Sequence, residues 1–347
     1  MSRFWNQKTN AIEPYVAGEQ PGEGQKVIKL NTNENPYPPS PNIGALLKTF
    51  DEERLRLYPD TSCTALREAF AEFYGVRPTQ VFCGNGSDEV LAFAFRAFFE
   101  SGPEAPPLLT PDISYSFYPV YAELFDIPLK KIPLRDDFSI APEDYFSQEG
   151  GVAIANPNAP TGLALPVESI RRILDANPDR VVLIDEAYAC FGGPSCIGLL
   201  SEYPNLLIIG TLSKSHSLAG LRLGYAVARP RIAEAIRKAT TPFAVSHVAQ
   251  LAGLASLRAK DELIARVDTI VAERAQMLHG LRAAGLPVLD SEANFVWLPL
   301  GEATSRFAAD AAAAGVVVRP FAGDGARISV GEPDATDSLL ELARTWT

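Results

Sequence analysis

The chain has 347 residues, of which 47% are hydrophobic and 21% charged, and its formal net charge at pH 7 is −11. This length allows two modest domains with cores of their own, and the composition is that of a globular enzyme. The acidic balance argues against a protein that binds nucleic acid, which needs a basic surface. Since no apolar run approaches the ~18 residues of a membrane helix, and the first residues lack an apolar signal core, we expect no membrane segment and a cytoplasmic protein.

Four cysteines without a Cys-x-x-Cys pair, and only three histidines, predict neither a metal site nor a disulfide framework. Residues 1–43 are rich in proline, asparagine and glycine and show no sustained period. They predict an extended arm that must dock to be ordered, on the smaller domain or on a partner subunit. A helix is then expected over 66–74 and a short strand over 81–83.

The next segment, Gly84-Asn-Gly-Ser-Asp88, leads directly into an apolar helix over 89–99. Such a turn can present backbone N–H groups to an anion, but Ser87 and Asp88 are equally good plain helix caps. A strand at 108–109 and an aromatic-rich segment from Tyr115 to Tyr121 follow. Aromatic stripes of this kind are more often part of a core than of a ligand site.

Two charged residues stand at the ends of predicted buried strands. Asp185 ends the apolar run 181–185, and Lys214 lies between the apolar runs 206–209 and 223–228, which we interpret as buried parallel strands. A lone lysine in a loop is usually solvated, but among small residues at a strand end it is a candidate for a Schiff base. An acid in this position faces the crevice where α/β sheets bind ligands.

The segments between and after these strands complete the predicted elements. A strand over 152–155 precedes a helix over 167–176, and the alternation through 81–228 predicts a mostly parallel sheet with helices on both faces. From about residue 245 the pattern changes to helices over 246–258 and 261–284, the latter with Glu273 and Arg274 on a solvated face. Short strands are predicted over 295–297, 316–318 and 328–330, and a helix over 304–314. These elements predict a smaller α+β C-terminal domain.

Lys214, Asp185 and the hydroxyl and guanidinium groups near Lys214 are the kinds of group that one cofactor requires from its protein. Pyridoxal phosphate requires a lysine for its aldehyde, a carboxylate for its pyridine nitrogen and donors for its phosphate. Lys214, Asp185 and the pair Ser213 and Arg222 supply these groups. His216 is either an acid–base group or, as we expect, a residue that caps or packs in the loop.

On these residues and on further motifs the chain resembles the fold-type I pyridoxal-phosphate aminotransferases, and within them the histidinol-phosphate aminotransferase branch. The similar stretches run in the family's order from residue 31 to residue 331 and cover almost the whole chain. They are Asn31-Thr-Asn-Glu-Asn-Pro36, Tyr58-Pro-Asp60, Gly84-Asn-Gly-Ser-Asp-Glu89, Tyr115-Ser-Phe-Tyr-Pro119, Asn156-Pro-Asn-Ala-Pro-Thr-Gly162, Asp185-Glu-Ala-Tyr188, Ser213 to Arg222, Glu292-Ala-Asn-Phe295 and Arg327-Ile-Ser-Val-Gly331.

The resemblance implies a role for each matching residue at the cofactor. Lys214 would bind the aldehyde, Asp185 the ring nitrogen and Tyr188 the ring oxygen, while Tyr115 would stack on the ring. The family has an asparagine directly before Pro-Thr-Gly for the ring oxygen, but Ala159 stands there, so either Asn158 or Asn156 replaces it or Tyr188 acts without it. The resemblance assigns the cofactor phosphate to Gly86, Ser87, Asp88, Ser213 and Arg222. It also implies a homodimer in which Tyr58 reaches the cofactor phosphate of the partner subunit.

The substrate side is implied in the same way. Arg327 would bind a carboxylate, although a surface arginine flanking a strand is an equal alternative, and Arg319, Tyr15 and Asn33 would line the rest of the site. The implied division is an arm (1–43), a large cofactor-binding domain (44–245) and a small domain (246–347).

We expect amino transfer from histidinol phosphate to 2-oxoglutarate, as a step of histidine biosynthesis. Open alternatives are an aromatic amino acid aminotransferase, a threonine-phosphate decarboxylase and, more remotely, a non-catalytic regulator that binds the cofactor.

Overall fold

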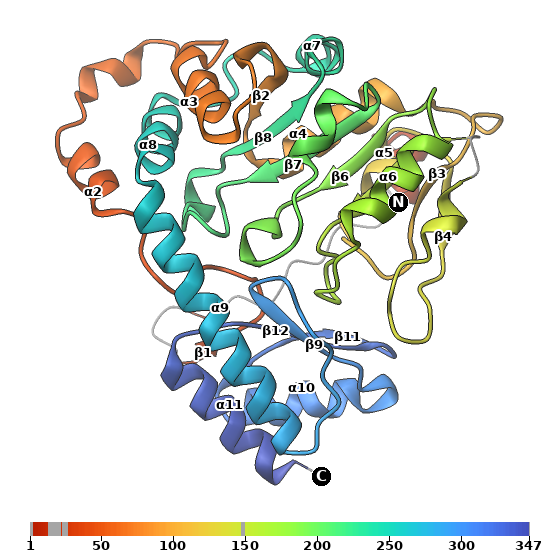
Figure 1. The fold of residues 1–347 in the computed structure, drawn as a ribbon, viewed down its shortest axis with the longest axis vertical. Coiled ribbons are helices and arrows are strands. Elements are labelled where there is room, and N and C mark those ends of the chain that lie inside the picture. Colours follow the sequence, from red (N-terminus) through yellow and green to blue (C-terminus); the bar gives the residue numbers. More distant parts are fainter. Residues whose placement is uncertain (1–2, 13–21, 23–26, 147–149, 347) are drawn as a thin grey trace.

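The computed structural model describes residues 3–12, 22, 27–146 and 150–346. A large sheet with helices on both faces forms one part, and a smaller part below it contains the C-terminal strands and helices (Figure 1). The long helix α9 (Lys260–Ala283) runs from the larger part down along the smaller one. Over the described ranges, no helix is both long and apolar enough to cross a membrane.

The large sheet has seven strands, and all except β8 run in the same direction. Each strand is a short apolar run that is buried along its whole length, apart from the edge strand β4, as expected for a sheet covered on both faces. In spatial order the strands are β2 (Val81–Gly84), β8 (Gly224–Ala228), β7 (Leu206–Thr211), β6 (Val182–Asp185), β5 (Val152–Ala155), β3 (Leu108–Pro111) and β4 (Leu129–Ile132).

The prediction that both strands flanking Lys214 are parallel strands is wrong for β8 and holds for β7, which pairs parallel with β6. Strand β8 is antiparallel both to β7 and to β2, and Thr211 lies opposite Gly224. A parallel pair needs a crossover that carries the chain back along the sheet, usually through a helix. The segment between Thr211 and Gly224 contains only a short 3-10 turn at Ala219–Leu221. The chain therefore reverses there, and Lys214 stays just beyond the carboxyl end of β7.

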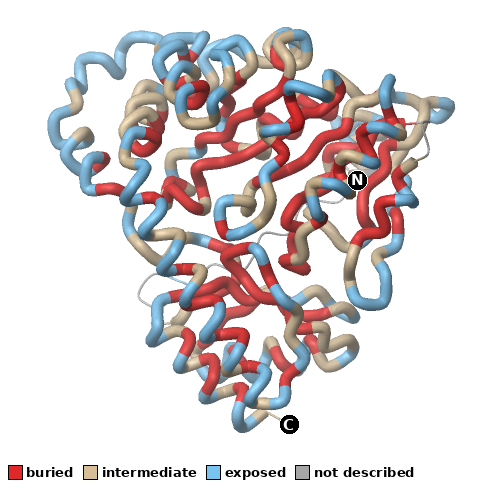
Figure 2. The backbone as a smooth tube through the Cα atoms, viewed as in Figure 1, coloured by how far each residue is buried: buried red, intermediate tan, exposed pale blue. Residues whose placement is uncertain are grey.

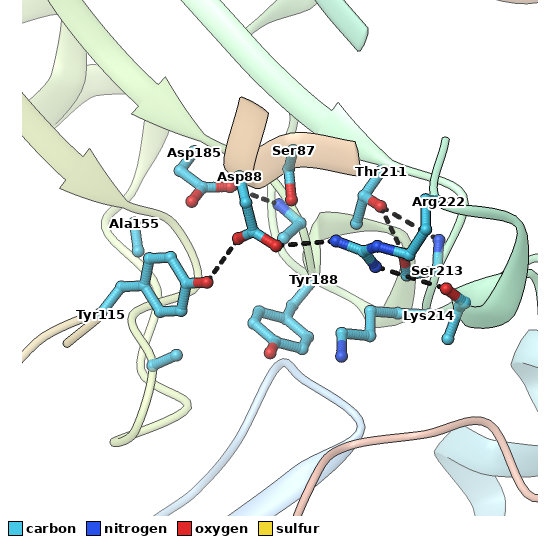
Figure 3. A pocket seen from close by; sticks show the side chains of 13 residues that line it. Ser87, Asp88, Tyr115, Ala155, Asp185, Tyr188, Thr211, Ser213, Lys214 and Arg222 are labelled. Carbon is cyan, nitrogen blue, oxygen red and sulfur yellow. Dashed lines mark hydrogen bonds and ion pairs between the residues drawn. The ribbon is translucent and has the colours of Figure 1, made fainter. Parts of the chain in front are cut away.

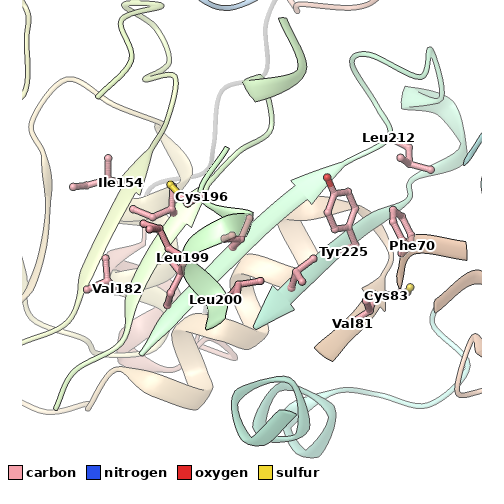
Figure 4. Packing of buried hydrophobic residues seen from close by; sticks show 14 of the residues in the cluster. Phe70, Val81, Cys83, Ile154, Val182, Cys196, Leu199, Leu200, Leu212 and Tyr225 are labelled. Atoms are coloured by element: carbon pink, nitrogen blue, oxygen red, sulfur yellow. The ribbon is translucent and has the colours of Figure 1, made fainter. Parts of the chain in front are cut away.

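Alternate residues of each strand enter two different cores. Leu183 and Leu207 pack toward the first set of helices, whereas their neighbours Ile184 and Ile208 pack toward the second. Figure 2 shows the resulting continuous burial of the strands, and Figure 4 shows the second core around Leu199 and Tyr225. The first set is α4 (Gly86–Phe98), α5 (Phe117–Leu124) and α7 (Pro230–Ala239); the second is α3 (Thr64–Tyr74), α6 (Val167–Ala176) and α8 (His247–Arg258), with α2 (Pro41–Lys48) beside α8.

The smaller part has an antiparallel sheet whose spatial order is β11 (Arg319–Phe321), β12 (Gly325–Ser329) and β9 (Phe295–Leu298). Its apolar face packs on α9, α10 (Thr304–Ala313) and α11 (Pro333–Thr345). The pair formed by β1 (Ile28–Lys29) and β10 (Val316–Val317) is parallel and joins the N-terminal segment to this part.

Helix α9 differs from the prediction at one point. Glu273 and Arg274 are buried, with 7% of each exposed, although the charge pattern predicted a solvated face. Arg274 Nη1 donates to the carbonyls of Phe191 at 2.9 Å and of Ala293 at 2.8 Å, so the helix binds to both parts of the chain at this residue. A periodic pattern of charges does not reveal such a partner, because the partner is a backbone atom far away in the sequence.

The described part of the N-terminal arm contacts both parts of the structure. Helix α1 (Gln7–Ala11) lies against the end of α5, where Lys8 Nζ donates to the Leu124 carbonyl at 2.6 Å and to Asp126 at 2.5 Å. The arm therefore contacts the larger part as well as the smaller one, which the prediction did not include. The domain boundaries at 43 and 245 stay predictions.

Candidate active site

A cavity opens at the edge of the large sheet where the parallel strands end. Its volume is about 120 Å³. The strands supply Ala155, Asp185 and Thr211 from their last residues, at the edge where α/β sheets bind ligands. The remaining lining residues come from the loops and from the start of α4: Ser87, Asp88, Tyr115, Ala159, Ala187, Tyr188, Ser213, Lys214, Ala219 and Arg222 (Figure 3).

One end of the cavity is built to receive an anion. Helix α4 begins at Gly86, the side chain of Asn85 does not cap it, and Ser87 and Asp88 of its first turn line the cavity, so the first N–H groups of the helix are available to an anion there. Gly86 has φ +87°, and a Cβ there would lie 2.6 Å from Arg222 Nη2. A Cβ at Gly224 would lie 2.3 Å from the Gly86 carbonyl carbon. The two glycines therefore let helix, strand and guanidinium come close together.

Asp88 connects this end of the cavity to its aromatic wall. Its carboxylate accepts from Arg222 Nη2 at 2.8 Å and from the Tyr115 hydroxyl at 2.6 Å, and Figure 3 shows both contacts. Burial, together with the nearby Asp88 charge, raises the pKa of Tyr115 well above its usual value, so this hydroxyl stays a donor. The aromatic segment predicted from the sequence thus contributes both to the core and to the cavity.

Asp185 is the buried acid of the site, with 5% of the residue exposed. Its carboxylate accepts from the Ala187 N–H at 3.1 Å and from the Tyr118 hydroxyl at 3.2 Å. Burial raises its pKa to about 6, and the two hydrogen bonds only partly offset that effect. Sequence reasoning missed Tyr118, although its spacing of three residues from Tyr115 at the start of a helix was a usable signal.

Lys214 and Tyr188 form the other wall of the cavity. Lys214 Nζ lies 6.0 Å from the centre of the Tyr188 ring and donates to the Thr32 carbonyl at 3.3 Å. Asn33 Nδ2 donates to the Tyr188 hydroxyl at 3.1 Å, so Asn33 acts on Tyr188 and does not line the cavity. Ser213 accepts from Thr211 Oγ1 at 2.8 Å, which fixes it beside the lysine.

Neither candidate asparagine lies in the cavity. Asn156 binds the backbone of Leu165 with both its amide oxygen and its nitrogen. The Asn158 amide donates to the Ile113 carbonyl and to Thr161 Oγ1, and its oxygen accepts from Ser114. Both side chains hold the loop together, and Tyr188 is the one of the three ring-oxygen candidates that lines the cavity.

The remaining predicted residues lie elsewhere. Tyr58 is 79% exposed and stacks on Phe243 with ring centres 4.4 Å apart. Tyr15 lies outside the described residues. His216 is buried and shares a 2.7 Å hydrogen bond with Ser256 Oγ, and burial lowers its pKa to about 3, so it packs as expected.

Arg319 and Arg327 lie directly opposite each other on β11 and β12. Both residues therefore belong to the same face of the small sheet. Neither lines the cavity, although Arg327 Nη2 donates to the carbonyl of Asn31, next to the Thr32 carbonyl that Lys214 binds.

The residues of the cavity fit pyridoxal phosphate. An amine, a buried carboxylate and an anion site at a helix N-terminus surround one space, and burial of Asp185 without a cation leaves its pKa raised. Over the described ranges, no group of three or more His, Cys, Asp or Glu residues is arranged to hold a metal ion.

Comparison with known proteins assigns the family. Residues 25–342 match the family model of aminotransferase class I and II, and the chain therefore belongs to this family. The chain is 43% identical to the histidinol-phosphate aminotransferase of Chromohalobacter salexigens, with 98% of each chain covered. It is also 43% identical to that of Acetobacter pasteurianus, covering 99% of this chain and 98% of the relative. The predicted enzyme class and the predicted branch are thereby confirmed.

A solved structure confirms the predicted fold class. The histidinol-phosphate aminotransferase of Sinorhizobium meliloti, determined in complex with pyridoxal-5'-phosphate, superposes with a TM-score of 0.89. The alignment covers 100% of this chain and 99% of that one, at 24% identity. The cofactor predicted for this chain is the one present in that complex.

Proposed function

We propose that the protein transfers the amino group of histidinol phosphate to 2-oxoglutarate, with pyridoxal phosphate as its cofactor, as a step of histidine biosynthesis. The observation that carries this proposal is the 43% identity to proteins of that name along almost the whole chain. The cavity supports it, because one space holds the amine, the buried acid and the anion site that such a reaction needs.

Bound pyridoxal phosphate supplies an aldehyde that takes up the substrate's amino group and a ring that withdraws electrons from the substrate's α-carbon. Lys214 would hold this aldehyde, and its Nζ would carry the proton from the substrate's α-carbon to the cofactor's C4′ carbon. The first turn of α4, Ser213 and Arg222 hold the phosphate. Tyr115 covers the ring.

Asp185 keeps the ring nitrogen protonated. Its burial makes an unpaired negative charge unfavourable, so a cation opposite it is bound strongly and in a fixed place. The Tyr188 hydroxyl, which Asn33 orients, is the donor to the ring oxygen, since Ala159 stands where the family has an asparagine.

Arg327 and Arg319 bind the anionic end of the substrate. The overall charge of −11 repels a phosphorylated donor at long range, so local cations must hold it. Histidinol phosphate has no carboxylate, and the arginine that binds the α-carboxylate of glutamate is therefore available for the phosphate. One anchor then serves both halves of the reaction.

The protein acts as a homodimer in this proposal. Several large apolar side chains are exposed around the Tyr58 segment, as expected for a surface that a second copy covers: Leu47, Leu55, Leu57, Tyr58 and Phe243. Tyr58 would then reach the partner's phosphate. The cytoplasmic location stays a prediction.

The products distinguish this function from its closest alternative. With histidinol phosphate and 2-oxoglutarate, the purified enzyme should form one glutamate for each donor consumed. With threonine phosphate it should release no carbon dioxide. Release of carbon dioxide without any need for an oxo acid would instead support the decarboxylase. If the protein catalyses neither reaction, the result would support the non-catalytic regulator.

A further inference from the structure

The small sheet has one face that belongs to the core and one that carries a distinct set of residues. Val296, Leu298, Ala326 and Ile328 pack into the core of the smaller part. Their neighbours in the chain point the other way, because side chains alternate along a strand and directly paired residues share a face. The register places on this second face Phe295, Trp297, Arg319, Phe321, Gly325, Arg327 and Ser329.

On this face Arg327 contacts two aromatic rings. Its guanidinium carbon lies 5.5 Å from the centre of the Phe295 ring and 5.8 Å from that of Phe321, both within the range of cation–π contact. Each ring attracts the cation toward its face, so the two contacts together restrict where the guanidinium can lie. The third fixed contact is the 3.0 Å hydrogen bond from Arg327 Nη2 to the Asn31 carbonyl.

Both rings are themselves held in place. Phe295 is fully buried and meets the Tyr188 ring edge-on, with centres 4.9 Å apart. Phe321 meets the ring of Trp297 at 5.5 Å. That ring occupies the space beside Gly325, where a Cβ would lie 2.6 Å from Trp297 Cζ2. The arginine is therefore supported through a chain of rigid rings that ends at the cofactor cavity.

We propose that Phe321 and Phe295 are positioning residues that hold the Arg327 guanidinium at one fixed point, and that Phe321 thereby sets the specificity for substrates with an anion at that point. The inference rests on the role proposed above for Arg327. An arginine clamped in this way does not swing aside for a neutral group, so the carboxylate of glutamate and the phosphate of the donor must reach the same place.

The two phenylalanines differ in what else they touch. Phe295 also supports Tyr188, so its replacement disturbs the cofactor side of the cavity as well as Arg327. Phe321 is half-buried at the end of the short strand β11 and contacts only Arg327 and Trp297 among the aromatic and cationic pairs described. Phe321 is therefore the residue whose replacement tests positioning alone.

The test measures KM and kcat of the holoenzyme for glutamate and for histidinol phosphate. Phe321→Leu should raise both KM values by about 3- to 30-fold while kcat stays within about twofold, because a lost positioning contact weakens binding of substrate and transition state alike. Phe321→Tyr keeps the ring and should restore both KM values. Phe307→Leu is the matched control: Phe307 is fully buried on the core side, so this variant should lower Tm and leave KM unchanged.

The outcomes separate the inference from the proposed function. If Arg327→Leu raises both KM values but Phe321→Leu raises neither, the positioning role is refuted and the proposed function stands. If Arg327→Leu itself leaves both KM values unchanged, the anchor assigned to Arg327 is wrong, and the inference fails with it. A rise in KM that Phe321→Tyr does not reverse would also contradict the role of the ring.

Discussion

Replacing Asp185 by asparagine should lower the turnover of the holoenzyme and raise the stability of the apoprotein. Burial raises the pKa of this carboxyl from its ordinary 3.8 to about 6. The folded apoprotein therefore disfavours the charged carboxylate by about 3 kcal/mol relative to the unfolded chain, at about 1.4 kcal/mol for each tenfold change in the ionisation constant. Asparagine has nearly the same shape and carries no charge.

The sign of the effect follows from which state ionises first. As pH rises, the unfolded chain loses this proton from about pH 4, whereas the folded chain keeps it until about pH 6. The wild-type apoprotein is thus progressively destabilised across this range, and the loss is complete above about pH 6.5. The Asp185→Asn apoprotein should be the more stable one by about 1–3 kcal/mol at pH 8, with the difference shrinking toward pH 4.

The holoenzyme should respond in the other direction. Without the carboxylate the ring nitrogen loses its partner, and turnover should fall by ~10²–10³. Urea unfolding of the apoprotein at several pH values and at one protomer concentration, together with steady-state turnover, measures both effects.

Glu186→Gln is the matched control for this experiment. Glu186 is a second buried acid, whose pKa burial raises to about 7, but it binds Ser195 and Cys196 and does not line the cavity. Its variant should also gain apoprotein stability at high pH while keeping most of its turnover. If Asp185→Asn is less stable than wild type at pH 8, the buried-charge reasoning is refuted; if its turnover is near normal, the role at the ring nitrogen is refuted.

Four further substitutions test other groups of the site. Lys214→Ala should abolish the borohydride-stable attachment of the cofactor, which peptide mapping of the wild type should locate at Lys214; attachment that persists in the variant would place it on another residue. Tyr188→Phe removes the hydroxyl to which Asn33 donates at 3.1 Å and should weaken cofactor binding by about 3- to 10-fold in a fluorescence titration, whereas unchanged affinity would leave the ring oxygen to another donor. Arg327→Leu should lower kcat/KM for glutamate and histidinol phosphate alike by about 10- to 150-fold, and Arg319→Leu mainly for the phosphorylated donor; equal losses for both substrates in Arg319→Leu would contradict this division.

Much of the architecture follows from local pattern. The buried strands and the helix over 167–176 are each specified within a few residues of sequence. The direction of β8 was missed because an apolar run looks the same in either direction, and only the short connection after Lys214 determines it.

The features that sequence reasoning missed depend on contacts distant in the chain. Arg274 is buried because two carbonyls, at Phe191 and Ala293, accept its hydrogen bonds. Asn158 does not line the cavity, because hydrogen bonds with Ser114 and the Ile113 carbonyl hold its side chain within the loop. Motif matching places a residue type in the right segment, but it does not say which way the side chain turns.

The proposed function depends most on selection of the amino donor by a phosphate at its far end. The most direct measurement is the single-turnover reaction of the cofactor-loaded enzyme with histidinol phosphate, histidinol and phenylalanine, followed by the change in the cofactor's visible absorbance. We predict that histidinol phosphate reacts with a specificity constant at least about 10-fold above that of either unphosphorylated donor, because one charge-assisted contact is worth about 1.5–3 kcal/mol. Equal rates for histidinol or phenylalanine would contradict this selection and would support an aromatic aminotransferase.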